Sequence, residues 1–296
     1  MYLTGFADEA GADIDTQVRA TRELGWRNIE SRNIGGTNIH DISDEEFDAV
    51  CRKLQDAGIR INCFGSAIAN WGKKITEPFD SSLEETTRAI PRMQQLGCKL
   101  IRIMSFAVID GREADEQVEE ERFRRLRELH KMFTDAGITP VHENCMNYGG
   151  MGWTYTLRLI ENVPGLKLVF DTGNPVFSLD RTKPKPHPTQ SAWEFYQHVK
   201  DHIEYVHIKD ALWDHINNKM LGFTFPGEGE GDVRAIVKDI LDSGYDGGIS
   251  MEPHLGEVPH DKTITAPEEI KYANYVEYGR RFMKLLEDIG YGDRIG

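Results

Sequence analysis

Four short apolar segments of the sequence each end in a side chain that can bind a divalent metal ion. A buried strand is usually a run of β-branched or aromatic residues, so a carboxylate or imidazole at its last position is costly. One such ending would mean little, but four, separated by 28, 36 and 45 residues, suggest strand ends that converge on one site. The segments are 140–143, 166–171, 203–207 and 248–252, which end in Glu143, Asp171, His207 and Glu252.

This set of donors predicts a metal-assisted enzyme. Three carboxylates and one imidazole suit a divalent ion such as Mn²⁺, Mg²⁺, Co²⁺ or Zn²⁺. Such an ion stabilises the enediolate that forms when a proton leaves the carbon beside a carbonyl group. If the substrate lies between Glu143 and Glu252, these carboxylates can remove and return that proton. Any one of the four could instead cap the loop that follows it, most plausibly Asp171, but this does not explain all four together.

Composition restricts the partners of the protein. The chain has 296 residues, of which 39% are hydrophobic and 28% charged, and its net charge of −14 repels the phosphates of nucleic acids. Its first residues resemble no signal peptide, and no apolar run is long enough to span a bilayer. The four cysteines lack the spacing of a disulfide framework or a zinc site. We therefore expect a cytoplasmic protein that binds neither nucleic acid nor membrane.

The elements that position the four side chains alternate along the sequence. An amphipathic helix, a turn with glycine and a short apolar strand recur, because glycine supplies the left-handed residue that ends a helix. Eight strands are expected, including 2–7 and 205–209. The helices are expected near 13–24, 44–57, 82–96, 117–136, 154–162, 189–201, 232–243 and 268–289. This alternation, without a linker, predicts an α/β protein with one domain over 1–296, a (β/α)8 TIM barrel. The rival open sheet would carry a Gly-rich dinucleotide turn, which the sequence lacks.

The segments that follow the predicted strands are longer than those that precede them. In a barrel, the loops after the strands form the face that carries the active site. Glu143, Asp171, His207 and Glu252 lie at this same face. Loop length and residue chemistry therefore point to one place.

In this arrangement, the chain resembles the xylose-isomerase-like barrel superfamily of sugar phosphate isomerases and epimerases. That group includes ketose 3-epimerases, inosose dehydratases and DNA repair enzymes of the endonuclease IV type. The resemblance covers essentially the whole chain and is most specific at 142–144, 170–174, 206–210, 227–231 and 251–254. It implies a carbohydrate substrate and a single Mn²⁺ or similar ion held by Glu143, Asp171, His207 and Glu252. It also implies that the two glutamates exchange the proton of the substrate.

Two positions depart from the pattern of these relatives. Many members carry a histidine where this chain has Asn174, and ketose epimerases carry an arginine where it has Trp213. Both departures weigh against a strict ketose 3-epimerase. The endonuclease site needs several further histidines, so Asn174 and the acidic surface also weigh against a nuclease.

Four further residues are candidates for substrate binding. Lys209 shares the inward side of its strand with His207 and can bind a substrate oxygen, or it can form a salt bridge to a neighbouring acid such as Asp210. His254 either contacts substrate or orients a metal ligand. Glu30 either hydrogen-bonds substrate hydroxyls or supports the rim. The fourth candidate is Trp153, which follows glycines that would allow a mobile lid.

Three other features favour structural roles. His142 precedes Glu143 on the same strand and is expected to point outward beneath a helix. The glycine-rich run 227–231 contains two glutamates that would repel phosphate, so it is expected to form a turn. The basic cluster 122–127 alternates with acids at helical spacing and is expected to be a solvated face.

The sequence leaves the reaction class open. The leading hypothesis is a metal-dependent isomerase or epimerase of a sugar or polyol-derived keto compound. A lyase or dehydratase would begin with the same proton abstraction, and a barrel that only binds sugar is a more remote alternative. A homo-oligomer is possible, because the predicted C-terminal helix carries aromatic residues that can pack on a neighbour: Tyr272, Tyr275, Tyr278 and Phe282.

Overall fold

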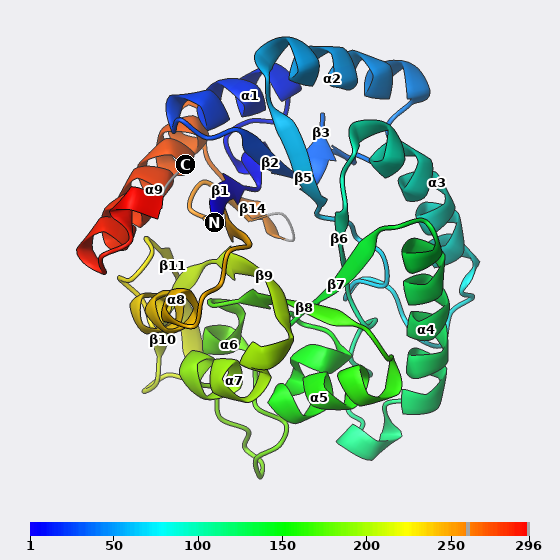
Figure 1. Cartoon of the computed structure of the whole chain (residues 1–296). Coiled ribbons are helices and arrows are strands. Elements are labelled where there is room, and N and C mark those ends of the chain that lie inside the picture. Colours follow the sequence, from blue (N-terminus) through cyan, green and yellow to red (C-terminus); the bar gives the residue numbers. More distant parts are fainter. Residues whose placement is uncertain (259–260, 295–296) are drawn as a thin grey trace.

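A barrel of parallel strands forms the centre of the computed structural model, which describes residues 1–258 and 261–294. Within these residues, eight strands follow one another around the sheet in the order β1-β12-β9-β8-β7-β6-β5-β2, and a parallel bridge between Phe6 and Glu30 joins its two ends. The strands are β1 (Tyr2–Gly5), β2 (Asn28–Ser31), β5 (Arg60–Phe64), β6 (Leu100–Ile103), β7 (Thr139–Glu143), β8 (Lys167–Asp171), β9 (Ile203–Ile208) and β12 (Gly248–Met251). The predicted TIM barrel is confirmed (Figure 1).

Helices surround the barrel in the order that the sequence predicts (Figure 1). They are α1 (Ile14–Glu23), α2 (Asp44–Ala57), α3 (Asp80–Leu96), α4 (Glu119–Asp135), α5 (Trp153–Asn162), α7 (Ala192–Val199), α8 (Val233–Asp242) and α9 (Glu268–Asp288). A short additional helix, α6 (Asn174–Phe177), follows β8. Local signals set several ends: Ser43 and Glu46 form a capping box at the start of α2, and Gly58 ends it with a left-handed backbone. None of the helices in the described part of the chain is long and apolar enough to cross a membrane.

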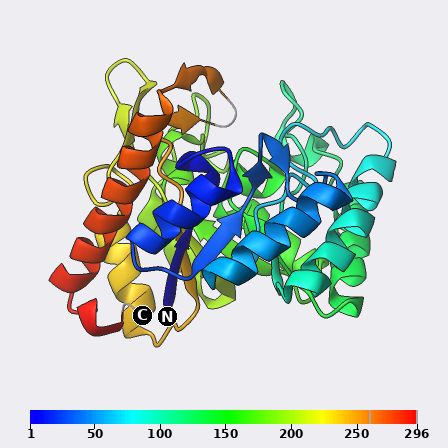
Figure 2. The ribbon, with the colours of Figure 1, turned by 90° about the horizontal axis from the view of Figure 1, so that it is seen from above.

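The loops after the strands contain small hairpins that the sequence did not predict. Three hairpins lie there: β3 (Asn33–Ile34) with β4 (Thr37–Asn38), β10 (Asp210–Asp214) with β11 (Lys219–Thr224), and β13 (Glu257–Val258) with β14 (Asp261–Thr265). Figure 2 shows the last two rising above the barrel, at the end opposite the chain termini. These segments have too few residues for a clear alternating pattern, so they were expected only as loops.

The barrel interior is divided between an apolar base and a polar mouth. Cys63, Val141, Val169 and Tyr205 pack together inside the base. Side chains two residues further along β7, β8 and β9 point the same way, because strand side chains alternate between faces. These are Glu143, Asp171 and His207, so the strand period that fills the base with apolar groups brings titratable groups to the mouth.

The aromatic residues of helix α9 pack mostly against the rest of the same chain. Tyr275, Tyr278 and Phe282 are buried against the rest of the barrel, and Tyr278 donates a hydrogen bond to the carbonyl oxygen of Ile208. Tyr272 is partly exposed and donates to Glu23. The suggestion that these rings pack on a second copy is therefore wrong for three of the four.

The basic cluster on α4 is not entirely a solvated face. Arg122 is fully buried, and its guanidinium donates hydrogen bonds to three backbone carbonyl oxygens, those of Gln117, Ser105 and Ala107, at 2.6–2.7 Å. Arg124, two residues further on, is half exposed and pairs with glutamates of its own helix. Arg122 thereby fixes the loop after β6, which forms part of the barrel mouth.

We expect Arg122→Leu to lower the free energy of unfolding by about 2–4 kcal/mol, because three carbonyl oxygens, two of them in buried hydrogen bonds and one in a partly buried one, lose their donor. Arg124→Leu is the matched control on the same helix, and its loss should stay under about 1 kcal/mol. Urea denaturation of both variants measures the difference. Equal losses would contradict the role assigned to Arg122.

Candidate metal centre

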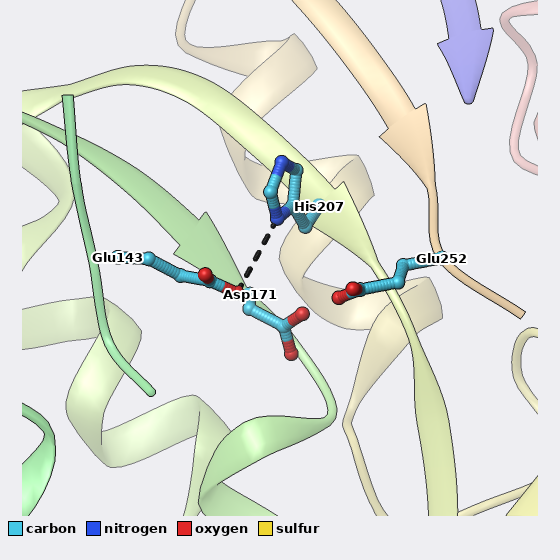
Figure 3. Close-up of side chains that lie close together, drawn as sticks. All are labelled: Glu143, Asp171, His207 and Glu252. Carbon is cyan, nitrogen blue, oxygen red and sulfur yellow. Dashed lines mark ion pairs between the residues drawn. The ribbon is translucent and has the colours of Figure 1, made fainter. Parts of the chain in front are cut away.

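Four buried side chains meet at the mouth of the barrel, and they are the four that the sequence singles out. One donor atom from each of Glu143, Asp171, His207 and Glu252 lies within 4.8 Å of the others. Glu143 and Asp171 are the last residues of β7 and β8, His207 lies near the end of β9, and Glu252 directly follows β12. Figure 3 shows their side chains turned toward a common centre. Parallel strands that end at the same face therefore assemble a compact set of donors.

Glu30 holds the imidazole of His207 in place. Both carboxylate oxygens of Glu30 lie 3.0–3.1 Å from His207 Nε2, and both residues are fully buried. The other ring nitrogen, Nδ1, faces the centre, 3.5 Å from Glu143 Oε1, without a hydrogen bond. Burial alone would lower the pKa of His207, but the charges of Glu30 and Glu143 raise it to about 10. Glu30 thus lies behind His207 rather than at the rim.

Asp171 both caps a loop and contributes to the centre. Its Oδ1 accepts hydrogen bonds from the backbone N–H groups of Gly173 and Asn174 at 2.7–2.8 Å. Its Oδ2 lies 2.9 Å from Lys209 Nζ but has no aligned hydrogen-bond donor. Burial raises the pKa of the carboxyl above its usual value. One oxygen of Asp171, Oδ1, therefore caps the loop, while the other, Oδ2, is left for the centre.

Buried carboxylates outnumber buried cations around the centre. Two arginines that the sequence analysis missed partly neutralise them: Arg102 Nη1 lies 3.1 Å from Glu143, and Arg32 Nη1 lies 2.9 Å from Glu252. With Lys209 they give three fixed cations, and protonated His207 would be a fourth, facing six buried or nearly buried carboxylates: Asp8, Glu9, Glu30, Glu143, Asp171 and Glu252. A divalent cation would offset most of this excess. Neither His207 Nδ1 nor Asp171 Oδ2 has a hydrogen-bond partner among the described residues, and together with this charge that makes the donor set fit a divalent metal ion.

The position of Arg102 in the sequence could have indicated its role. It lies in the apolar strand β6, between Ile101 and Ile103, where a charged residue is as unusual as the four strand endings. The position of Arg32 gave no such indication, because it follows β2 in a polar loop.

Lys209 and His254 reach the centre beside Glu252. Lys209 Nζ lies 2.6 Å from Glu252 Oε2, so it pairs with the centre and not with Asp210. His254 Nδ1 lies 3.0 Å from Glu9, and its Nε2 lies 3.7 Å from Glu252. The backbone of His254 is left-handed, with φ of 53°, and its N–H donates to Glu9. Both residues are therefore held in place around one of the two glutamates.

A cavity of about 240 Å³ opens above these side chains. Glu143, Glu252, Lys209 and His254 are among the residues that line it. Its lining also includes aromatic and apolar groups: Trp71, Met104, Met146 and Phe177. Asn174, which stands where many relatives have histidine, donates from Nδ2 to Glu143 Oε1 at 3.2 Å. Of the four donors, Glu143 and Glu252 line this cavity, so a small ligand can reach the centre beside these two glutamates.

The structure does not bring Trp153 to this cavity. Trp153 lies at the start of α5, and its ring stacks on that of His198 in α7, with 3.7 Å between the ring centroids. The glycines before it are buried, and a Cβ added at Gly150 would lie 1.6 Å from the carbonyl oxygen of Cys145. These glycines allow close packing of the backbone, so the expectation of a mobile lid is not supported.

His142 points away from the centre, as strand alternation predicts. Its Nε2 lies 3.0 Å from Ser105 Oγ and 3.2 Å from Asn147 Oδ1, and the residue is fully buried. Burial lowers the pKa of His142 to about 4. A neutral imidazole in this position supports the loop after β7.

The fold agrees with a family comparison. The model of the family described as "Xylose isomerase-like TIM barrel" matches residues 18–291 of the chain. This protein belongs to the xylose isomerase-like TIM barrel family. No curated protein sequence matches it. The resemblance inferred from the strand endings is therefore confirmed at the level of the family.

Several solved structures share the fold at low sequence identity. A D-tagatose 3-epimerase-like protein has a TM-score of 0.70 and 14% identity over 98% of both chains. A xylose isomerase-like barrel from Mycobacterium smegmatis, in complex with magnesium, has a TM-score of 0.67 and 18% identity over 97% of both chains. The probable 3-DHS dehydratase AsbF from Bacillus anthracis has a TM-score of 0.65 and 16% identity, covering 93% of this chain and 96% of its own.

The glycine-rich run 227–231 forms a turn around the carboxylate of Asp210, as the sequence predicts. Asp210 accepts hydrogen bonds from the backbone N–H groups of Gly227, Gly229 and Gly231 at 2.8–3.0 Å. A Cβ added at Gly229 would lie 2.3 Å from Asp210 Oδ1, so the close approach requires glycine there. Asp210 therefore ties this loop to the end of β9, directly after Lys209.

We expect Asp210→Ala to lower the free energy of unfolding by about 2–4 kcal/mol, because partly or fully buried N–H groups lose their acceptor. Asp214→Ala is the matched control, because Asp214 at the end of β10 also accepts three hydrogen bonds, but exposed ones, so the change should stay under about 1 kcal/mol. Thermal and urea unfolding provide the comparison. A small effect at Asp210 would show that the turn holds without its carboxylate.

Proposed function

We propose that this protein is a divalent-metal-dependent isomerase or epimerase of a sugar or polyol-derived keto compound. The observation that carries the proposal is the pair of buried glutamates, Glu143 and Glu252, which belong to one four-donor cluster and line one small cavity. The family comparison supports enzymatic action on carbohydrate, since structural neighbours include proteins named as sugar epimerases.

Glu143, Asp171, His207 and Glu252 would hold the ion, with Mn²⁺ as the leading candidate and Mg²⁺, Co²⁺ and Zn²⁺ as alternatives. When bound, the ion supplies Lewis-acid stabilisation of the enediolate oxygens. Glu30 fixes the tautomer and orientation of His207 through Nε2, which leaves Nδ1 as the donor atom. Asn144 supports Asp171 in a similar way, because its amide exchanges hydrogen bonds with the backbone of Asp171.

The two glutamates would take and return the proton of the substrate. Burial alone would raise the pKa of Glu143, but Arg102 and His207 together hold it below its usual range. Burial would also raise the pKa of Glu252, but the positive charges of Lys209, His254 and Arg32 lower it below its usual value. Both side chains are therefore carboxylates at neutral pH, the form that a proton acceptor requires.

A lyase or dehydratase is the second candidate, and the groups beside Glu252 support it. Lys209 and His254 both line the cavity and lie within 3.7 Å of Glu252. Either can donate a hydrogen bond to a leaving hydroxyl group after the same first proton abstraction. The probable dehydratase among the structural neighbours is consistent with this alternative.

We expect Glu30→Gln to weaken the binding of Mn²⁺ by about 10- to 100-fold, although Glu30 is no ligand, because His207 loses its orienting carboxylate. His207→Ala should weaken it further. Isothermal titration of metal-free protein with Mn²⁺ measures both effects. His215→Ala, on the exposed β10–β11 hairpin, is the control and should bind like the parent protein.

If Glu30→Gln and the control bind Mn²⁺ with the same affinity, the metal-site assignment of His207 fails. Unchanged binding by His207→Ala would contradict the whole donor set.

We expect Glu143→Gln and Glu252→Gln each to slow exchange of the substrate proton by about 10²- to 10⁴-fold, because glutamine keeps the shape of the side chain but accepts no proton. Candidate keto-sugars are incubated in D₂O and the products analysed. Deuterium in a rearranged sugar indicates an isomerase or epimerase, and an unsaturated product indicates a lyase. Glu228→Gln, an exposed residue paired with Arg281, is the control and should keep full activity.

A further inference from the structure

A second hollow adjoins the cavity above the candidate metal centre. Its volume is about 390 Å³, and it shares Trp71, Met146 and Phe177 with the inner cavity. From this common wall it continues over the loops after β6, β7 and β8. We call it the outer groove, and its remaining walls include Ala107, Val108, Asp110, Met151, Leu179 and Arg181. Any ligand that fills both spaces would pass the shared wall.

The two spaces differ in chemistry. Ten of the seventeen residues that line the inner cavity are charged or hydrogen-bonding, whereas seven of the twelve that line the outer groove are apolar and four are polar: Asp110, Asn147, Ser178 and Arg181. Met146 and Leu179 each expose 40% of their surface there, although both are large apolar residues. Neighbouring apolar side chains left open beside a polar site are typical of a surface that a ligand covers.

The size of the inner cavity points in the same direction. Its volume of about 240 Å³ lies below the roughly 300–1,000 Å³ of most small-molecule sites. One sugar unit placed with its oxygens toward Glu143 and Glu252 would leave the rest of a larger substrate directed into the outer groove. The groove thus continues the proposed site and needs no separate ligand.

We propose that the outer groove binds an apolar, aromatic aglycone, so that the substrate is a sugar conjugated to such a group and not a free monosaccharide. This inference rests on the proposed function of the inner site. Trp71 and Phe177 provide rings at the junction of the two spaces. Arg181 forms no ion pair with any described residue, so its guanidinium is available to an aromatic face or a phenolic oxygen.

Matched pairs of methyl and phenyl β-glycosides of glucose, galactose and xylose test the proposal by titration calorimetry on the Mn²⁺-loaded protein. We expect the phenyl member of at least one pair to bind about tenfold tighter or more, because its ring covers apolar surface in the outer groove. Leu179→Glu should remove most of this preference and leave the affinity for the methyl glycoside unchanged. Leu221→Glu is the matched control, because Leu221 is exposed on β11 and should leave both affinities unchanged.

Two results would overturn the inference: equal affinities within every pair for the parent protein, or equal weakening of both members by Leu179→Glu. The first of these, found together with deuterium exchange in free sugars, would leave the proposed function intact and refute only the aglycone. Absence of both glycoside binding and deuterium exchange would refute the proposed function and the aglycone together.

Discussion

The mouth of the barrel must hold more negative than positive charge away from water, and the surrounding structure is arranged around this constraint. Isolated buried carboxylates would be strongly destabilising, so each needs a cation, a hydrogen-bond donor or a metal ion. Arg102 serves Glu143, Arg32 serves Glu252, and Lys209 lies between Glu252 and Asp171. Two of these residues, Arg102 and Lys209, link the ends of neighbouring strands, whereas Arg32 reaches from the end of β2 past β1 to the end of β12.

The same constraint explains why the first strands matter to a site whose donors come from the last four. Glu30 at the end of β2 orients His207 of β9, and the bridge between Phe6 and Glu30 closes the barrel at the same point. Arg32, just beyond β2, reaches Glu252 after β12. The same residue, Glu30, therefore takes part in closing the barrel and in orienting a donor. A sheet left open between β1 and β2 would lose the contact that fixes the imidazole.

Backbone groups complete the arrangement where charged side chains do not reach. Asp171 Oδ1 is satisfied by N–H groups at the start of α6, which leaves its other oxygen for the centre. Asp210 is satisfied by three glycine N–H groups, which fix the loop beside Lys209. Such bonds hold the loops without adding charge to an already crowded site. The outer groove lies beyond this region and is lined by none of the six carboxylates of the barrel mouth.

The sequence by itself determined the barrel, the order of its elements and the four converging donors. These follow from local patterns: apolar runs mark strands, glycine marks helix ends, and alternation along each strand sets which side chains face inward. Tertiary structure alone decided the partners of those donors. Glu30 meets His207 across 177 positions and Arg32 meets Glu252 across 220, and no local pattern encodes such pairs. The glycines before Trp153 suggested mobility, whereas the tight packing of Gly150 against Cys145 is visible only in the folded chain.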